Sequence, residues 1–211
     1  MNGAATPARP PARSWARDQS VGSVDLYWIP LGAGGHFVRF NGKVYEAFSA
    51  RRGRRPEQDL YHSALEIGLP EGRSAIEMAW PVPKAPGNER GVVREGPVGW
   101  KWASRFRVLR YEVRCWLNGS IPDIDYAMGS PIRVSNDVHT ARHILGLAPL
   151  VPPLVWGRDE LGTGDMWNSN SCISWLLERS GVDTIGLHPP QGGRAPGWDA
   201  GLFAAQQAAL Q

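Results

Sequence analysis

The stretch that decides the fold is Trp167-Asn168-Ser169-Asn170-Ser171-Cys172-Ile173-Ser174-Trp175-Leu176-Leu177, in which a polar segment runs directly into an apolar one. Serine and asparagine are favoured helix caps, and the apolar residues that follow recur at spacings of three and four. The pattern predicts a helix from about Ser169 to Ser180 that ends at Gly181. Ser169 would then place a hydroxyl nucleophile at a helix N-terminus, where developing negative charge is stabilised.

A second informative segment, Tyr61-His62-Ser63-Ala64-Leu65-Glu66-Ile67, lies about a hundred residues upstream and alternates as a strand. The turn residues 70–73 predict a hairpin of residues 61–67 with 74–80. We expect Leu65 to lie opposite Met78, and Ile67 opposite Ile76. This register places Ser63 and the apolar residues on a core face. The other face carries His62, the carboxylates Glu66 and Glu77, and the alanines Ala64 and Ala79. The small alanine side chains leave room beside the histidine for a helix tip or a substrate.

The rest of the chain is organised around these two segments. Residues 1–22 are rich in Pro, Ala, Arg, Gly and Ser and predict a disordered N-terminal arm, so that residues 23–211 form a single domain. Within that domain we expect strands at residues 24–29 and 106–116. A helix is expected at residues 137–147, capped by Ser135 or Asn136. Residues 182–211 are expected to wrap the surface. The loop 31–36 lacks the third glycine of a nucleotide-binding loop.

Composition excludes several classes of function. No apolar run approaches the roughly 20 residues needed to cross a bilayer, so we expect a cytoplasmic protein without a membrane partner. The net charge of +3 is too small to indicate a nucleic-acid partner. The basic run 51–55 is interpreted as a solvated loop, with a phosphate-contacting loop as the alternative. His139 and His143 lack a third ligand at a familiar spacing, and therefore no metal or cofactor is expected.

Taken together, the two motifs resemble the PPPDE family of permuted papain-fold peptidases, which includes deSUMOylating isopeptidases. They resemble more distantly the lecithin:retinol acyltransferase and NlpC-type amidase group. In the PPPDE pattern a strand beginning Tyr/Trp-His-Ser/Thr carries the catalytic histidine, as in Tyr61-His62-Ser63, and Asn-Cys-Asn begins the nucleophile helix, as in Asn168-Ser169-Asn170. Residues 24–27 and 156–160 also resemble family segments. The resemblance covers roughly residues 24–180, with an insertion near 82–130.

This resemblance implies an α+β, circularly permuted papain-like fold in which an antiparallel sheet packs on the helix that carries the nucleophile. It departs from the family at one position, because Ser169 replaces the nucleophilic cysteine. Cys172 lies three residues later within the apolar stripe, so it is interpreted as a core residue, with a catalytic thiol as the alternative. A serine needs a base as it attacks, and His62 is the candidate, oriented by Asp165 or by a backbone carbonyl.

Two readings of the site remain open on the sequence. In the first, His62 and Ser169 hydrolyse or transfer an acyl group from an amide, isopeptide or thioester bond of a peptide or protein substrate. Supporting or binding residues would be Asp165, Trp167, Asn168, Asn170, Ser171 and Cys172. In the second, the polar residues are only helix caps, and the domain is a catalytically inactive relative that binds a peptide or protein. Glu66 and Glu77, if paired, would form a rival acid/base site.

Overall fold

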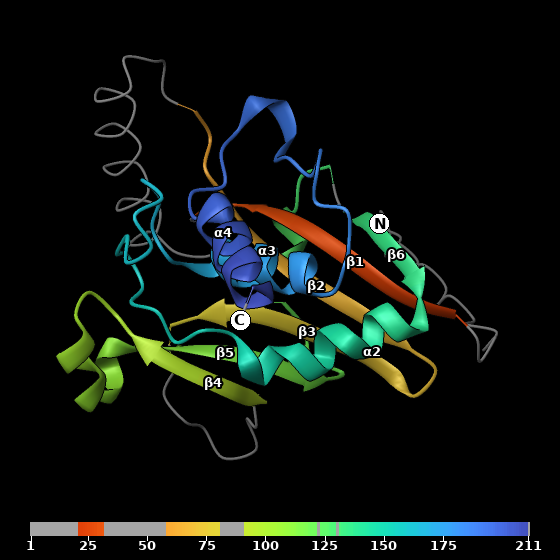
Figure 1. The fold of residues 1–211 in the computed structure, drawn as a ribbon. Coiled ribbons are helices and arrows are strands. Elements are labelled where there is room, and N and C mark those ends of the chain that lie inside the picture. The colour runs from red at the N-terminus through yellow and green to blue at the C-terminus, as the bar shows by residue number, and fades with distance from the viewer. Residues whose placement is uncertain (1–20, 32–57, 81–90, 122, 130, 211) are drawn as a thin grey trace, which may run out of the picture.

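A computed structural model of the chain describes residues 21–31, 58–80, 91–121, 123–129 and 131–210 (Figure 1). Six strands form one sheet in the order β4-β5-β3-β2-β1-β6, and every neighbouring pair is antiparallel. The strands are β1 (Val21–Pro30), β2 (Tyr61–Leu69), β3 (Gly72–Ala79), β4 (Val92–Pro97), β5 (Arg110–Leu117) and β6 (Ile132–Asp137). The predicted α+β class is confirmed.

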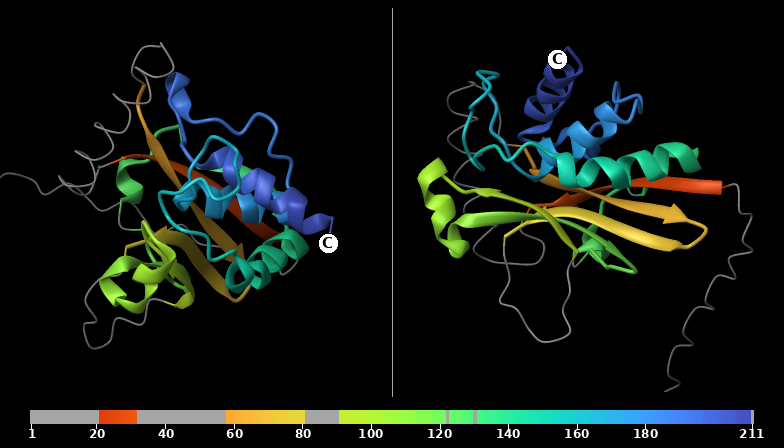
Figure 2. Two further views of the ribbon diagram at one scale, coloured as in Figure 1. Left: turned by 60° about the vertical axis from the view of Figure 1, so that its left-hand side comes forward. Right: turned by 60° about the horizontal axis from the view of Figure 1, so that its bottom comes forward.

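Among the residues that the structure describes, three helices cover one face of this sheet (Figure 2), and the main hydrophobic core lies between the two layers. The helices are α2 (Val138–Leu147), α3 (Ser169–Arg179) and α4 (Trp198–Ala209). Five short 3₁₀ turns complete the described structure: η1 (Lys101–Arg105), η2 (Arg107–Leu109), η3 (Ile124–Tyr126), η4 (Ala148–Leu150) and η5 (Pro190–Gly192). Among the described residues, no helix is both long and apolar enough to cross a membrane.

The β2–β3 hairpin forms as predicted, but its register differs by two residues. Leu65 pairs with Ile76, and Ile67 pairs with Ser74. The turn is tighter than the predicted turn of residues 70–73, because the two strands are paired as far as Leu69 and Gly72. Gly72 has a φ of 148°, a backbone conformation that glycine adopts readily. A shift of two residues leaves every side chain on its predicted face. Glu66 is therefore opposite Ala75 rather than Glu77.

The second face of the sheet carries a small apolar cluster among charged side chains. Ile29, Ala64 and Ala75 are buried there beneath Ile121, which belongs to the segment between β5 and β6. The room predicted beside Ala64 is thus filled by the chain itself. Charged pairs lie on the same face, including Asp25 with Arg133 and Glu66 with Arg73.

Three predicted elements need correction. The helix α2 is capped by Asp137, whose carboxylate accepts the backbone N–H of Thr140, rather than by Ser135 or Asn136. Residues 107–109 form a 3₁₀ turn before β5, so the strand predicted over 106–116 begins four residues later. The C-terminal segment forms α4, which packs on α3. The loop 32–36, the basic run 51–55 and arm residues 1–20 lie outside the described residues.

Candidate functional site

The N-terminus of α3 is held by its own polar side chains. The Asn168 carboxamide oxygen accepts the backbone N–H groups of Asn170 and Ser171, and the Ser171 hydroxyl accepts the N–H of Asn168. This reciprocal pair is a capping box, with serine at the third position. The cap predicted from the sequence is confirmed, and Asn168 is its first residue.

The same side chains fasten α3 to its neighbours. The Asn170 amide nitrogen donates to the carbonyl oxygens of Tyr61 on β2 and of Pro196 before α4, at 2.9 and 2.8 Å. The Ser171 and Ser174 hydroxyls donate to the carbonyl oxygens of Gly197 and Trp198. Asn170, Ser171 and Ser174 are therefore structural links between α3, β2 and the start of α4.

Asp165 and Trp167 also serve the fold. One carboxylate oxygen of Asp165 accepts the backbone N–H of Gly197, and the other accepts that of Met166. Asp165 therefore anchors the start of α4, and among the described residues its carboxylate makes no hydrogen bond to His62. Trp167 is 1% exposed and belongs to the main core, so it lines no cleft.

The strand residue that faces α3 is Ser63. Its hydroxyl donates to the Asn170 carboxamide oxygen at 2.9 Å, and both side chains are buried. Neighbouring residues of a strand point to opposite faces, so the side chain of His62 points away from α3. Its cross-strand partner Ile29 belongs to the apolar cluster of the second face.

The structure therefore corrects the predicted pair of His62 and Ser169, which lie on opposite faces of the sheet. The physical reason is that α3 is buried along nearly its whole length and packs on the apolar face, whereas His62 lies on the polar one. Burial lowers the pKa of His62 to about 4, with Asp123 acting in the opposite direction. The imidazole is therefore neutral near pH 7 but remote from the helix tip.

Ser169 is the first residue of α3 and is 8% exposed. Within the described part of the chain, its hydroxyl has no hydrogen-bond partner, and no histidine or carboxylate is bonded to it. A serine hydroxyl without a base is a poor nucleophile. The helix tip thus provides backbone N–H groups, and among the described residues no histidine or carboxylate is hydrogen-bonded to the Ser169 hydroxyl as a proton acceptor.

Cys172 is fully buried in the main core, which confirms its interpretation as a core residue. Burial raises the pKa of its thiol to about 12. Because only the thiolate is nucleophilic, we expect iodoacetamide at pH 8 to modify Cys172 at least about a hundredfold more slowly in the native protein than in denaturant. The measurement is made by mass spectrometry on a Cys115→Ala variant. Equal rates in both conditions would contradict the burial of this thiol.

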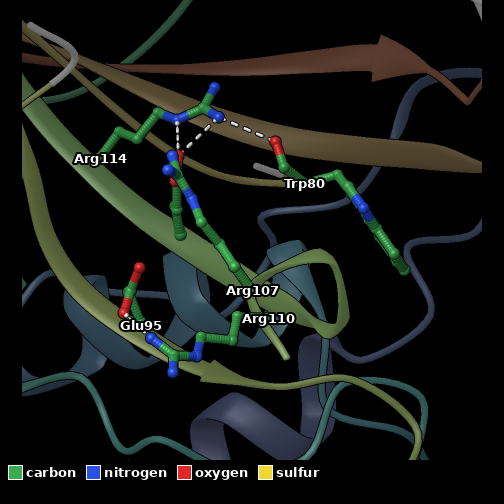
Figure 3. Close-up of polar contacts among 6 residues, drawn as sticks. Trp80, Glu95, Arg107, Arg110 and Arg114 are labelled. Atoms are coloured by element: carbon green, nitrogen blue, oxygen red, sulfur yellow. Dashed lines mark hydrogen bonds and ion pairs between the residues drawn. The ribbon is translucent and has the colours of Figure 1, made fainter. Parts of the chain in front are cut away.

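A charged cluster occupies the second face, over β3 and β5. Glu77, Glu112 and Arg114 are each less than a tenth exposed. The Arg114 guanidinium donates to one oxygen of each carboxylate at 2.9 Å and to the carbonyl oxygen of Trp80, as Figure 3 shows in part. Arg107 approaches Glu112 at 3.9 Å. The cluster satisfies its own charges and is a structural element of the sheet.

The predicted rival site of Glu66 and Glu77 does not form. Glu66 pairs with Arg73 at 3.1 Å, whereas Glu77 pairs with Arg114. Burial raises the pKa of Glu66, followed by a smaller lowering by Arg73. Glu66 and Glu77 form ion pairs with different arginines, and therefore the two carboxylates do not share a proton.

The segment that contains η1 and η2 lies beyond the ends of β4 and β5 (Figures 1 and 2). Together with neighbouring residues it carries an exposed aromatic and basic surface that the sequence patterns above did not indicate. We call it the aromatic–cationic tip and define it as Trp100, Trp102, Arg105, Phe106 and Arg158. Trp100 and Trp102 stack at 6.4 Å between centroids. The Arg158 guanidinium lies over Trp100 at 5.1 Å, and that of Arg105 lies 5.8 Å from Trp102 and 5.9 Å from Phe106.

The sequence does contain a signal for this tip. Residues 100–110 read Trp-Lys-Trp-Ala-Ser-Arg-Phe-Arg-Val-Leu-Arg, with three aromatic and four basic residues and no acidic one. Exposed aromatic residues beside arginine are typical of binding surfaces. In the structure Trp100 and Trp102 are 58% and 59% exposed.

Within the part of the chain that the structure describes, no group of three or more metal-ligating side chains is present. His139 and His143 are both exposed on α2. In comparisons with known proteins, no family model, no curated protein and no solved structure matches this chain.

Proposed function

We propose that this chain is a catalytically inactive relative of the permuted papain-like fold, and that it binds a peptide or protein partner through the aromatic–cationic tip. The observation that carries the proposal is the contact between Ser63 and Asn170. It occupies the place between the sheet and the tip of α3 where a base and a nucleophile would have to meet. Neither a hydroxyl nor a carboxamide can act there as the general base.

The tip supports the binding half of the proposal. Tryptophan and arginine dominate the binding energy of protein interfaces, and both are concentrated here. Monomeric proteins rarely expose contiguous large apolar side chains, yet Trp100, Trp102 and Phe106 are each about half exposed or more. Their mutual contacts hold the rings in place, so little conformational entropy would be lost when a partner binds.

A random peptide library displayed on phage tests the binding function. We expect the immobilised protein to enrich peptides with a shared sequence pattern. Trp100→Ala with Trp102→Ala should weaken the enriched peptides at least about thirtyfold, because removal of such anchors typically costs 2 kcal/mol or more. Ile185→Ala is the matched control, since Ile185 is 91% exposed and lies outside the tip. Enrichment that survives loss of both tryptophans, or no enrichment, would refute the proposal.

The catalytic half is tested at Ser169. We expect a fluorophosphonate probe to leave Ser169 unlabelled, as judged from the intact mass and from digested peptides. Ser169→Ala should change the free energy of unfolding by less than about 0.5 kcal/mol, because the hydroxyl has no described partner. A stoichiometric label on Ser169 that disappears in His62→Ala would instead establish the acyl hydrolase.

A further inference from the structure

The two arginines of the aromatic–cationic tip are held in fixed orientations. The Arg158 Nε atom donates to the carbonyl oxygen of Gly99 at 2.7 Å, and the Arg105 Nε atom donates to that of Trp102 at 3.4 Å. Each guanidinium also lies over an aromatic ring. Because Nε is already engaged, the two Nη groups form the free end of each cation, and a planar fork of this kind fits a carboxylate in bidentate geometry.

Neighbouring cations are already neutralised. Lys101 pairs with Glu160 at 2.8 Å, and Arg110 pairs with Glu95 at 2.9 Å. Among the described residues, Arg105 and Arg158 have no carboxylate partner, although both are exposed. The positive charge that remains for a partner is therefore concentrated on the Arg105 and Arg158 guanidinium groups, and not on the paired cations beside them.

This geometry favours one class of partner over others. Each tryptophan ring of the tip is contacted by the other ring and by a guanidinium, so stacking of a nucleobase would compete with contacts already made. A lipid surface is fluid and gains little from cations fixed in one orientation. Carboxylate side chains on a polypeptide would gain the most binding free energy. The Arg105 and Arg158 guanidinium groups, and the aromatic rings beneath them, already have the orientation needed for bidentate contact.

We propose that the partner is an acidic protein segment that presents two carboxylate side chains within about five residues of one another. This rests on the proposed function, whose binding site it specifies. The contacts of 5.1, 6.4 and 5.8 Å that link Arg158, Trp100, Trp102 and Arg105 place the two guanidinium carbons no more than about 17 Å apart. An extended chain advances roughly 3.3 Å per residue, so five residues cover this span.

The test uses peptides of 14 residues built from Gly, Ser and Leu, with two glutamates four residues apart, two glutamates nine apart, or two glutamines four apart. Binding is followed at low salt by the indole N–H signals of Trp100 and Trp102 in NMR, assigned with tryptophan-to-phenylalanine variants. We expect the first peptide to bind at least about tenfold more tightly than the glutamine peptide and several-fold more tightly than the widely spaced one.

The variant Arg105→Lys with Arg158→Lys keeps the charge and removes both forks. This double variant should bind the acidic peptide at least about fivefold more weakly, because lysine cannot form the bidentate contact. Arg142→Lys on α2, which is exposed and paired with Glu71, is the matched control and should have no effect. Unchanged binding in the double variant, equal binding of the glutamine peptide, or a preference for a 12-nucleotide single strand or phosphatidylserine vesicles would overturn the inference. Library enrichment of non-acidic peptides through Trp100 and Trp102 would overturn it while leaving the proposed function intact.

Discussion

Arg114→Met is expected to lower the free energy of unfolding by about 3–5 kcal/mol, the largest effect of any substitution considered. Arg114 is 2% exposed and is hydrogen-bonded to both Glu77 and Glu112. Methionine has similar volume, so the loss comes from electrostatics and not from a cavity. The buried carboxylates of Glu77 and Glu112 would remain. The only arginine described near either of them would be Arg107, 3.9 Å from Glu112. Urea denaturation followed by circular dichroism measures the change.

Two companion variants separate charge from packing. Arg142→Met removes an arginine that pairs with Glu71, and both side chains are about half exposed, so solvent compensates and the loss should stay below about 1 kcal/mol. The triple variant Arg114→Met, Glu77→Gln, Glu112→Gln should recover much of the lost stability, because the buried charges are gone. Arg114→Met with an unfolding free energy within about 1 kcal/mol of wild type would show that the cluster is not a structural element.

Asn170→Asp is expected to lower the free energy of unfolding by about 3 kcal/mol, although the two side chains have nearly the same shape. Asn170 donates through its amide nitrogen to the carbonyl oxygens of Tyr61 and Pro196, and it is 2% exposed. An aspartate would turn this donor into a carboxylate oxygen that faces two carbonyl oxygens. The cost is that of buried, unsatisfied acceptors and an unpaired charge.

The control is Asn136→Asp, an exposed site at which the side-chain oxygen accepts from Arg133. The change should be neutral or slightly stabilising. Protonation of the carboxylate introduced at position 170 would remove its repulsion with the carbonyl oxygens of Tyr61 and Pro196. The loss of unfolding free energy in Asn170→Asp should therefore become smaller as the pH falls below the pKa of this buried carboxyl. Unfolding curves that coincide for Asn170→Asp and wild type at pH 7 would contradict the link between β2, α3 and α4.

The elements predicted most reliably were those with local signals. The α3 helix was predicted because its polar cap and apolar stripe lie within a dozen residues. Alternation placed Ser63 and His62 on the correct faces of β2. The wrong step was to bring the tip of α3 to the polar face, although the apolar stripe of that helix has to be buried against the apolar one.

Other features depend on contacts that no local pattern contains. The α4 segment has little contrast between polar and apolar residues, and its place is set by close approach to α3, where a Cβ atom on Gly201 would overlap Ser174. The pairing of Glu77 with Arg114 depends on the register of β3 with β5. The exposure of Trp100 and Trp102 depends on the 3₁₀ turns between β4 and β5, which weak local propensities do not specify.

The bond between Ser63 and Asn170 has a kinetic consequence. It joins residues 107 positions apart, and the pairing of β1 with β6 likewise brings together segments separated by about the same length of chain. Such contacts require large loops to close before any enthalpy is gained. We therefore expect folding to be limited by the closure of these long loops rather than by the pairing of adjacent segments. Until the loops close, the apolar stripes of β1 and β2 would be exposed to intermolecular association.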